Sequence, residues 1–335
     1  MSNPSEPPHG GDPPSHLRGF TVDSGFSVIP AKRPRAVTAA SWMMFVYAGL
    51  ALLGTGVMVV DAITGPGLGT QPLFRIVVDL LRSALMIGLV LALLLAAVGT
   101  RQGRDAARVT GFVVVGGAGF VAVMLGMRSI AHDLFFRETG RFDGMELLVA
   151  SLVFGTAATT VVLLATPRAD TWFHEQRGDK YLNPENPDVR RPRGPAAAAA
   201  LLVLIAVLEL AVLVFRFLEG APGSTERGFA EHLFMFSPDT LPIVLAAVIT
   251  AVLITRGNDI TRIIAFGLCG LLISGLLTAL ISLLSILGSS STSNATTGYF
   301  FDVATTPAQG VLAVVVIMSL GRGPVAAWFH KQRTD

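Results

Sequence analysis

The sequence predicts an all-α membrane protein whose eight transmembrane helices form two tandem, parallel four-helix repeats, with both termini in the cytoplasm. Of its 335 residues, 52% are apolar and only 14% are charged, a balance that is unusual for a water-soluble chain. Several apolar runs reach the roughly 20 residues that cross a ~30 Å hydrocarbon layer as a helix. A six-residue phrase that begins at Trp172 recurs at Trp328, and this predicts the duplication.

Residues 1–36 come first and are rich in Pro, Gly and Ser. Such a composition buries too little apolar surface to fold alone, so we expect a disordered cytoplasmic tail. The first apolar run starts too late, and is too long, for a cleavable signal peptide.

Eight apolar spans follow the tail. They cover residues about 37–60, 76–99, 109–128, 146–166, 196–217, 240–255, 263–286 and 304–320. The sixth span is the shortest. Most of the 25 Lys and Arg residues fall in segments that a cytoplasmic N-terminus would place inside. The positive-inside rule therefore favours cytoplasmic N- and C-termini.

Three landmarks divide the chain into a first repeat over 37–177, a cytoplasmic linker over 178–190 and a second repeat over 191–333. Arg33-Pro34-Arg35 recurs as Arg191-Pro192-Arg193, the stripe Asp105, Arg108, Phe112, Gly116 recurs as Asp259, Arg262, Phe266, Gly270, and the tryptophan phrase recurs near each repeat's end. Because four spans are an even number, both repeats keep one orientation, and the pseudo-twofold axis should follow the membrane normal.

The turn Gly103-Arg104-Asp105-x-x-Arg108, together with the Trp-Phe phrase after the fourth span, resembles uncharacterised multipass membrane proteins of actinobacteria. Asn258 stands in the second turn where the first has Arg104. The resemblance implies an origin and no activity. Abundant Ala, Gly, Val and Arg also indicate a GC-rich bacterial genome, so we expect the bacterial cytoplasmic (inner) membrane.

Glu209 lies about 20 Å into the fifth span, where an ionisable group is a candidate functional site. Arg82 in the second span could lie at a similar depth and pair with it. Asp79 precedes Arg82 by three residues on the same helix face and could complete a triad. The alternative is a structural bridge, or a protonated Glu209 bonded to a neighbour. Ala51 takes the equivalent position in the first repeat, so the site is not part of the duplication.

The tryptophan phrases predict contacts at the inner membrane interface. The residues expected to touch lipid or a partner are Trp172, Phe173, His174, Arg177, Trp328, Phe329, His330, Lys331 and Arg333. Anchoring to lipid headgroups is favoured over docking of a cytoplasmic partner. In each repeat the acid–base pair, Asp105 with Arg108 and Asp259 with Arg262, is expected to stabilise its helix start locally.

Small residues crowd the third and seventh spans, including Gly270-x-x-x-Ser274 and Ala118-x-x-x-Ala122. Such spacings let helix backbones approach closely, so we expect these spans to make the inner contacts of the bundle. Homodimerisation through the same faces is the alternative.

The sequence contains no phosphate-binding glycine loop, no His-Glu-x-x-His and no nucleophile with a credible base. We therefore expect no enzyme activity, no cofactor, no metal site and no nucleic-acid partner. The predicted function is a membrane scaffold or accessory subunit that binds lipids, an envelope protein or a second copy of itself. The alternative is a small-molecule or ion transporter with its pathway between the repeats.

Overall fold

The computed structural model describes residues 33–64, 73–135, 144–177, 192–220, 240–288, 297–322, 324–326 and 328–329, and throughout these ranges the regular structure is helical. The chain divides at Lys32 into two units, and the unit that begins at Arg33 contains all of these residues. The predicted tail over 1–36 thus lies outside the described residues except for its last four positions.

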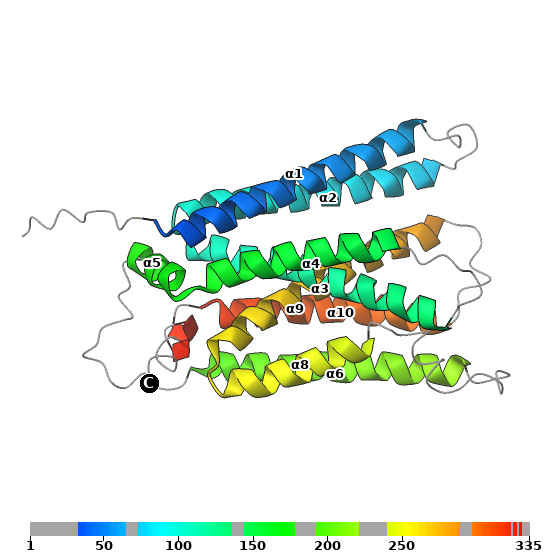
Figure 1. The fold of residues 1–335 in the computed structure, drawn as a ribbon. Coiled ribbons are helices and arrows are strands. Elements are labelled where there is room, and N and C mark those ends of the chain that lie inside the picture. Colours follow the sequence, from blue (N-terminus) through cyan, green and yellow to red (C-terminus); the bar gives the residue numbers. More distant parts are fainter. Residues whose placement is uncertain are drawn as a thin grey trace, which may run out of the picture. The chain divides into compact units, whose positions relative to one another are not determined.

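The helices follow one another along the chain with short breaks (Figure 1). The first group comprises α1 (Arg35–Thr64), α2 (Leu73–Arg101), α3 (Asp105–Phe135), α4 (Gly144–Ala165) and the short α5 (Pro167–Arg177). The second group comprises α6 (Arg193–Gly220), α8 (Thr240–Thr255), α9 (Asp259–Gly288) and α10 (Thr297–Leu320). Each of the eight predicted spans coincides with one long helix, although the fourth extends one residue past the end of α4. The short helix α5 was not predicted.

Six of these helices are long and apolar enough to cross a membrane by length and composition: α1, α2, α3, α4, α6 and α9. The apolar stretches of α8 and of α10, over Thr240–Thr255 and Ala304–Leu320, are shorter. The described residues thus confirm an all-helical chain with several helices that are long and apolar enough to cross a membrane. That α8 and α10 also cross stays a prediction.

Two glycines end the helices that precede α3 and α9. Gly103 has a φ of 74° and Gly257 a φ of 77°, the left-handed conformation that side chains disfavour. Their amides donate to the carbonyls of Thr100 and Ile254, at 3.2 and 3.1 Å. The chain can therefore reverse within three residues after α2 and after α8.

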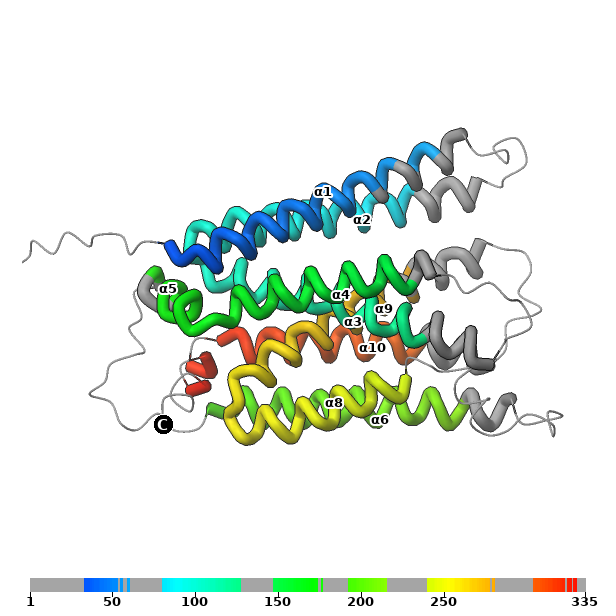
Figure 2. Tube along the Cα trace, viewed as in Figure 1, coloured from blue at the N-terminus to red at the C-terminus, as the bar shows by residue number. Residues whose placement is uncertain are grey.

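The helix contacts have the same order in both groups. In the first, α1 packs on α2 and α4, and α3 also packs on α2 and α4. In the second, α6 packs on α8 and α10, and α9 also packs on α8 and α10. Each group therefore closes into a ring of four helices. The two rings meet where α3 packs on α9, and α9 also touches α2 and α4 (Figures 1 and 2).

Several contacts place particular helix ends side by side. Nε of Arg101, at the end of α2, donates to Oγ of Ser41 in α1 at 2.7 Å. A Cβ added to Gly194 in α6 would lie 2.8 Å from the carbonyl oxygen of Ser319 in α10. We call the end of the bundle that holds α5, the α2–α3 and α8–α9 turns and Leu320 the α5 end, and the opposite end the far end.

Large apolar side chains cover the outside of the bundle. Leu95 is 72% exposed and Leu53 is 69% exposed, while alanines such as Ala40, Ala97 and Ala198 are fully buried. Small side chains inside bring helices close together, and exposed leucines suit a hydrocarbon solvent better than water. The surface thus supports the membrane class that the composition predicts.

Candidate functional site

A buried ion pair lies at the α5 end. Arg108, at the start of α3, donates through Nη1 to Oδ1 of Asp170 in α5 at 2.5 Å. Both side chains are only 8% exposed. Nε of Arg108 donates to the carbonyl of Leu164 at 3.2 Å, one of the last carbonyls of α4 that lack a partner within the helix. One guanidinium thus connects three helices.

Aromatic rings enclose this guanidinium. Its carbon lies 5.1 Å from the ring centre of Phe173 and 5.4 Å from that of Phe112. Phe173 is 1% exposed and contacts Trp172 edge-on, with ring centres 5.0 Å apart and planes at 69°. The rings exclude water and offer their faces to the cation.

The second group repeats most of this geometry. Nε of Arg262 donates to the carbonyl of Leu320 at 3.1 Å, and the guanidinium lies 5.5 Å from the ring of Phe266. Trp328 and Phe329 have ring centres 4.9 Å apart and planes at 70°. The position that corresponds to Asp170 at the spacing of the tryptophan phrase is Ala326. Asp170 therefore has no acidic counterpart at the matching position of the second group.

Helix α5 lies directly on the α2–α3 turn. A Cβ added to Gly103 would lie 2.6 Å from Cγ of Gln176 and 3.3 Å from Cη2 of Trp172. Nε1 of Trp172 is buried and has no hydrogen-bond partner in the described part of the chain. The glycine turn, the arginine stripe and the tryptophan phrase, which are separate in the sequence, thus form one packed cluster, which we call the Arg108 cluster.

The four aromatic residues of the phrases differ from the expectation of lipid or partner contact. Trp172, Phe173, Trp328 and Phe329 are at most 6% exposed and belong to the hydrophobic core. Packing against the helices removes more of each ring from water than a place among headgroups would. The side chains of His174, Arg177, His330, Lys331 and Arg333 lie outside the described residues, so their contacts stay predictions.

Arg108 also has a carboxylate partner outside its own helix. Its ion pair is with Asp170, 62 positions away, and the local effect expected of Asp105 stays a prediction. One signal in the sequence could have indicated this contact. The arginine stripe and the tryptophan phrase recur together in both halves, and segments that are duplicated together are candidates for direct contact.

The expected pairing of Glu209 with Arg82 is not formed. Arg82 is exposed on α2, whereas Glu209 is 9% exposed on α6. Helix α2 packs on α1, α3 and α9, while α6 packs on α8 and α10, so the two side chains belong to different rings. Depth alone could not reveal which helices are neighbours. The side chain of Asp79 lies outside the described residues.

Glu209 instead faces the interior of the second ring. Helices α6 and α10 meet where Gly194 contacts Ser319, and this contact gives a common reference level. Glu209 lies 15 residues from it along α6, about 22 Å. Thr305 lies 14 residues from it along α10, about 21 Å. Thr305 is 8% exposed and Gln309, one turn away, is 3% exposed. The second ring therefore holds buried polar side chains at the depth of Glu209.

Glycines close the contact between the rings. A Cβ added to Gly116 would lie 2.8 Å from Cα of Gly267, and one added to Gly117 would lie 2.8 Å from the carbonyl carbon of Gly270. Nearer the α5 end, Phe112 and Phe266 stack with ring centres 6.5 Å apart. The expectation that small residues make the inner contacts is confirmed for α3 and α9.

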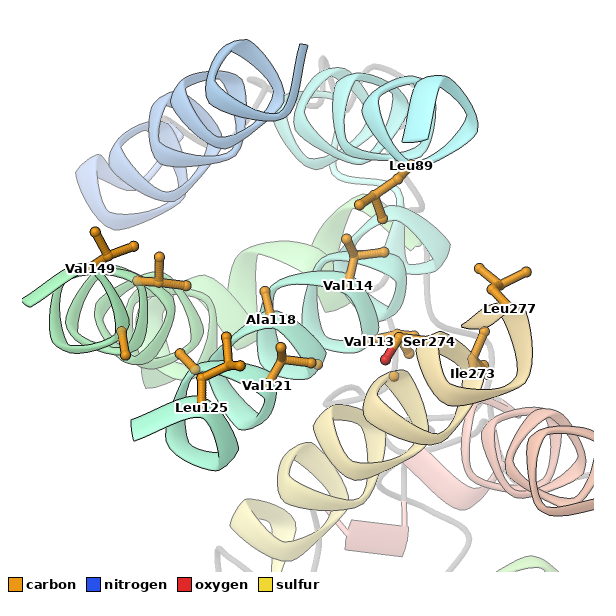
Figure 3. A pocket seen from close by; sticks show the side chains of 15 residues that line it. Leu89, Val113, Val114, Ala118, Val121, Leu125, Val149, Ile273, Ser274 and Leu277 are labelled. Atoms are coloured by element: carbon orange, nitrogen blue, oxygen red, sulfur yellow. The ribbon is translucent and has the colours of Figure 1, made fainter. Parts of the chain in front are cut away.

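An apolar cavity of about 550 Å³ lies between α2, α3, α4 and α9 (Figure 3). Leu89 of α2 points toward Val114 of α3, and Val149 of α4 lies across the opening. Ser274 is the single polar side chain among the described residues of its lining, and its hydroxyl donates to the carbonyl of Leu271 at 2.7 Å. Ala118 and Ala122 also line this cavity.

Among the described residues, no three His, Cys, Asp or Glu side chains gather as metal ligands would. No protein-family model matches the chain, and comparisons with curated proteins and with solved structures give no significant similarity. Function therefore has to be argued from the residues and their geometry.

Proposed function

We propose that the chain is a non-enzymatic scaffold or accessory subunit of the bacterial cytoplasmic membrane, made of two fused four-helix repeats. Its outer helix faces bind lipids, an envelope protein or a second copy of the chain. The observation that carries this proposal is the glycine contact between α3 and α9, which joins the two rings backbone to backbone.

A duplication is supported by geometry at corresponding positions. The two arginines, Arg108 and Arg262, each donate to the carbonyl at the end of their ring's fourth helix, at 3.2 and 3.1 Å. The two tryptophan–phenylalanine pairs agree within 0.1 Å and 1°, from 5.0 and 4.9 Å and from 69° and 70°. The ring order of helix contacts is also the same in both groups.

The α3–α9 contact favours a static role over a transport role between the repeats. Backbone atoms at Gly117 and Gly270 are too close to admit a solute. The cavity beside this contact is lined by apolar side chains, which do not replace the hydration of a polar solute. A scaffold needs rigid, defined outer faces, and close backbone packing provides that rigidity.

The start of α1 and the end of α10 both lie at the α5 end, because Ser41 meets Arg101 there and Ser319 meets Gly194. If all eight long helices cross, an even number of crossings returns the chain to the side where it began. Basic residues that include Arg101, Arg104 and Arg256 gather at this end, so we assign it to the cytoplasm.

A transporter is the alternative, and one observation favours it. Glu209 is buried in the second ring, level with Thr305, and intramembrane carboxylates commonly mark ion or proton pathways. Such a pathway would run inside the second ring. The sequence had instead suggested a pathway between the repeats.

Gentle isolation of the tagged protein from its native membrane, followed by mass spectrometry, tests the proposal. A stoichiometric envelope protein supports the scaffold. A protein that carries one enriched small solute and no partner contradicts it and favours transport. The variant Glu209→Gln separates the two roles. A structural Glu209 lowers the melting temperature in detergent when neutralised, whereas a carrier stays folded and loses solute binding.

A further inference from the structure

We infer that the cavity between α2, α3, α4 and α9 holds one acyl chain of an anionic phospholipid whose phosphate is bound by Arg82. This inference rests on the lipid-binding part of the function proposed above and assigns it a place and a chemical class. It draws on the cavity, on an exposed cation and on the register between them.

Arg82 is a cation without a protein partner among the described residues. It is exposed within an apolar helix, and in the described part of the protein no hydrogen bond or ion pair reaches its guanidinium. Arg82 lies 19 residues from Arg101, about 28 Å along α2, close to the ~30 Å thickness of a bilayer's hydrocarbon. If Arg101 lies at one headgroup layer, Arg82 lies at the other. The anion available there is a lipid phosphate, which a guanidinium can bind with two parallel hydrogen bonds.

Register places the cavity below this phosphate. Leu89, which lines the cavity, follows Arg82 by seven residues. Seven residues are two helical turns, so both side chains lie on one face of α2, about 10 Å apart along the axis. A lipid bound at Arg82 would therefore carry its acyl chains down the same face toward Leu89.

The cavity suits hydrocarbon and opens to the membrane. About 550 Å³ is the size of a small-molecule site, and apolar side chains form nearly all of its lining. Leu89, Leu125 and Val149 line it and are 38%, 52% and 50% exposed, so the cavity reaches the protein surface within the apolar helices. At that depth the surrounding solvent is lipid acyl chain.

The second ring fills the corresponding positions with polar side chains. Val149 and Val153 line the cavity, and the residues 156 positions later are Thr305 and Gln309, both buried. Ala51 similarly corresponds to Glu209. The acyl site is therefore a property of the first ring, and the two rings differ in what their interiors can hold.

The test is native mass spectrometry of the full-length protein in detergent, titrated with phosphatidylglycerol or with zwitterionic phosphatidylcholine. We measure the first, tightest lipid-binding step. Arg82→Gln should weaken this step for phosphatidylglycerol about fivefold, as expected for one cation near a lipid phosphate. The loss should be smaller for phosphatidylcholine, whose choline cation offsets the charge of its phosphate. Ala118→Phe, which fills the cavity, should weaken the step for both lipids.

Two variants serve as matched controls, and a second cavity variant guards against misfolding. Arg256→Gln removes an exposed cation at the α5 end, and Ala211→Phe adds a ring to the exposed face of α6. Both should leave the first binding step unchanged. Val149→Phe fills the cavity from its half-exposed rim, where a larger side chain fits without crowding the core.

The inference is overturned if Arg82→Gln binds phosphatidylglycerol as the wild type does, or if neither cavity variant weakens binding. Inorganic phosphate that binds as tightly as the lipid would also overturn it, because the acyl chain would then contribute nothing. If the lipid-binding results contradict the inference but an envelope protein still co-purifies with the wild type and the variants, the lipid site is wrong and the scaffold proposal is retained. If no envelope protein co-purifies with the wild type, the scaffold proposal itself is contradicted.

Discussion

Arg108 joins α3, α4 and α5 through one side chain. Its guanidinium has a carboxylate, a helix-terminal carbonyl and two aromatic faces around it. A charge that is this deeply buried depends on all of its partners, because each replaces part of the water that it has lost. The Arg108 cluster should therefore respond strongly to the removal of any single partner.

Asp170→Ala leaves Arg108 buried without its counter-ion and should lower the free energy of unfolding by about 3–5 kcal/mol. The double variant Arg108→Leu, Asp170→Ala removes both charges and should recover most of that loss. Denaturation in mixed micelles measures all three unfolding free energies. A double variant no more stable than Asp170→Ala would contradict a tightly coupled pair.

Phe173→Ala and Phe329→Ala remove rings that are 1% and 0% exposed at matching positions. Each should cost about 3–5 kcal/mol of stability, since a buried cavity is left behind. Phe154, which is 48% exposed on α4, provides the control, and Phe154→Ala should cost far less. If Phe173→Ala and Phe329→Ala cost as little as Phe154→Ala, the phrase rings lie at the surface and the account is contradicted.

At the scale of helices, much of the fold follows from composition and spacing. Each of the eight apolar runs coincides with a long helix, because roughly 20 apolar residues satisfy their backbone only as helix in lipid. Helix α5 was not predicted, because its sequence from Pro167 to Arg177 is short and polar and does not read as an apolar span. Contacts between helices, such as that of Arg108 with Asp170, could not be predicted in this way. They depend on which helices are neighbours, and the sequence of one apolar run does not contain that information.

The α3–α9 contact should not tolerate any side chain at its glycines. Gly117→Val places a branched side chain against the backbone at Gly270 and Leu271, so we expect a loss of about 1–3 kcal/mol or more from overpacking. Gly155→Val is the matched control, because a Cβ at Gly155 meets nothing within 4 Å. Thermal denaturation in detergent compares the two. A control that is as unstable as Gly117→Val would show that the loss comes from helix propensity and not from the contact.

At the scale of the whole molecule, two rings with related contacts have different interiors. An apolar cavity lies between α2, α3 and α4 of the first ring and α9 of the second, whereas the second ring buries Glu209, Thr305 and Gln309. The sequence indicated this asymmetry only at Ala51 and Glu209. The cavity itself could not be foreseen, because it results from how α2, α3, α4 and α9 come together.

Reporter fusions after Arg177 and after Arg333 test the proposed topology. Both should report the cytoplasm, because four crossings separate them and basic residues gather at that end. A fusion within residues 225–235, between α6 and α8, should report the opposite side. A periplasmic signal after Arg177 or Arg333 would exclude two parallel repeats.

The central claim is that the two rings form one rigid body, and paired spin labels test it most directly. The pairs Val162→Cys with Met318→Cys, and Leu148→Cys with Ala304→Cys, lie on exposed faces of α4 and α10, near the α5 end and the far end. Cys269→Ala removes the native thiol from the background. Double electron–electron resonance in lipid nanodiscs should give one narrow distance distribution for each pair. The contradicting result is two populations for each pair, in which a shorter distance at one end of the bundle accompanies a longer distance at the other end. That result would indicate a rocking transporter.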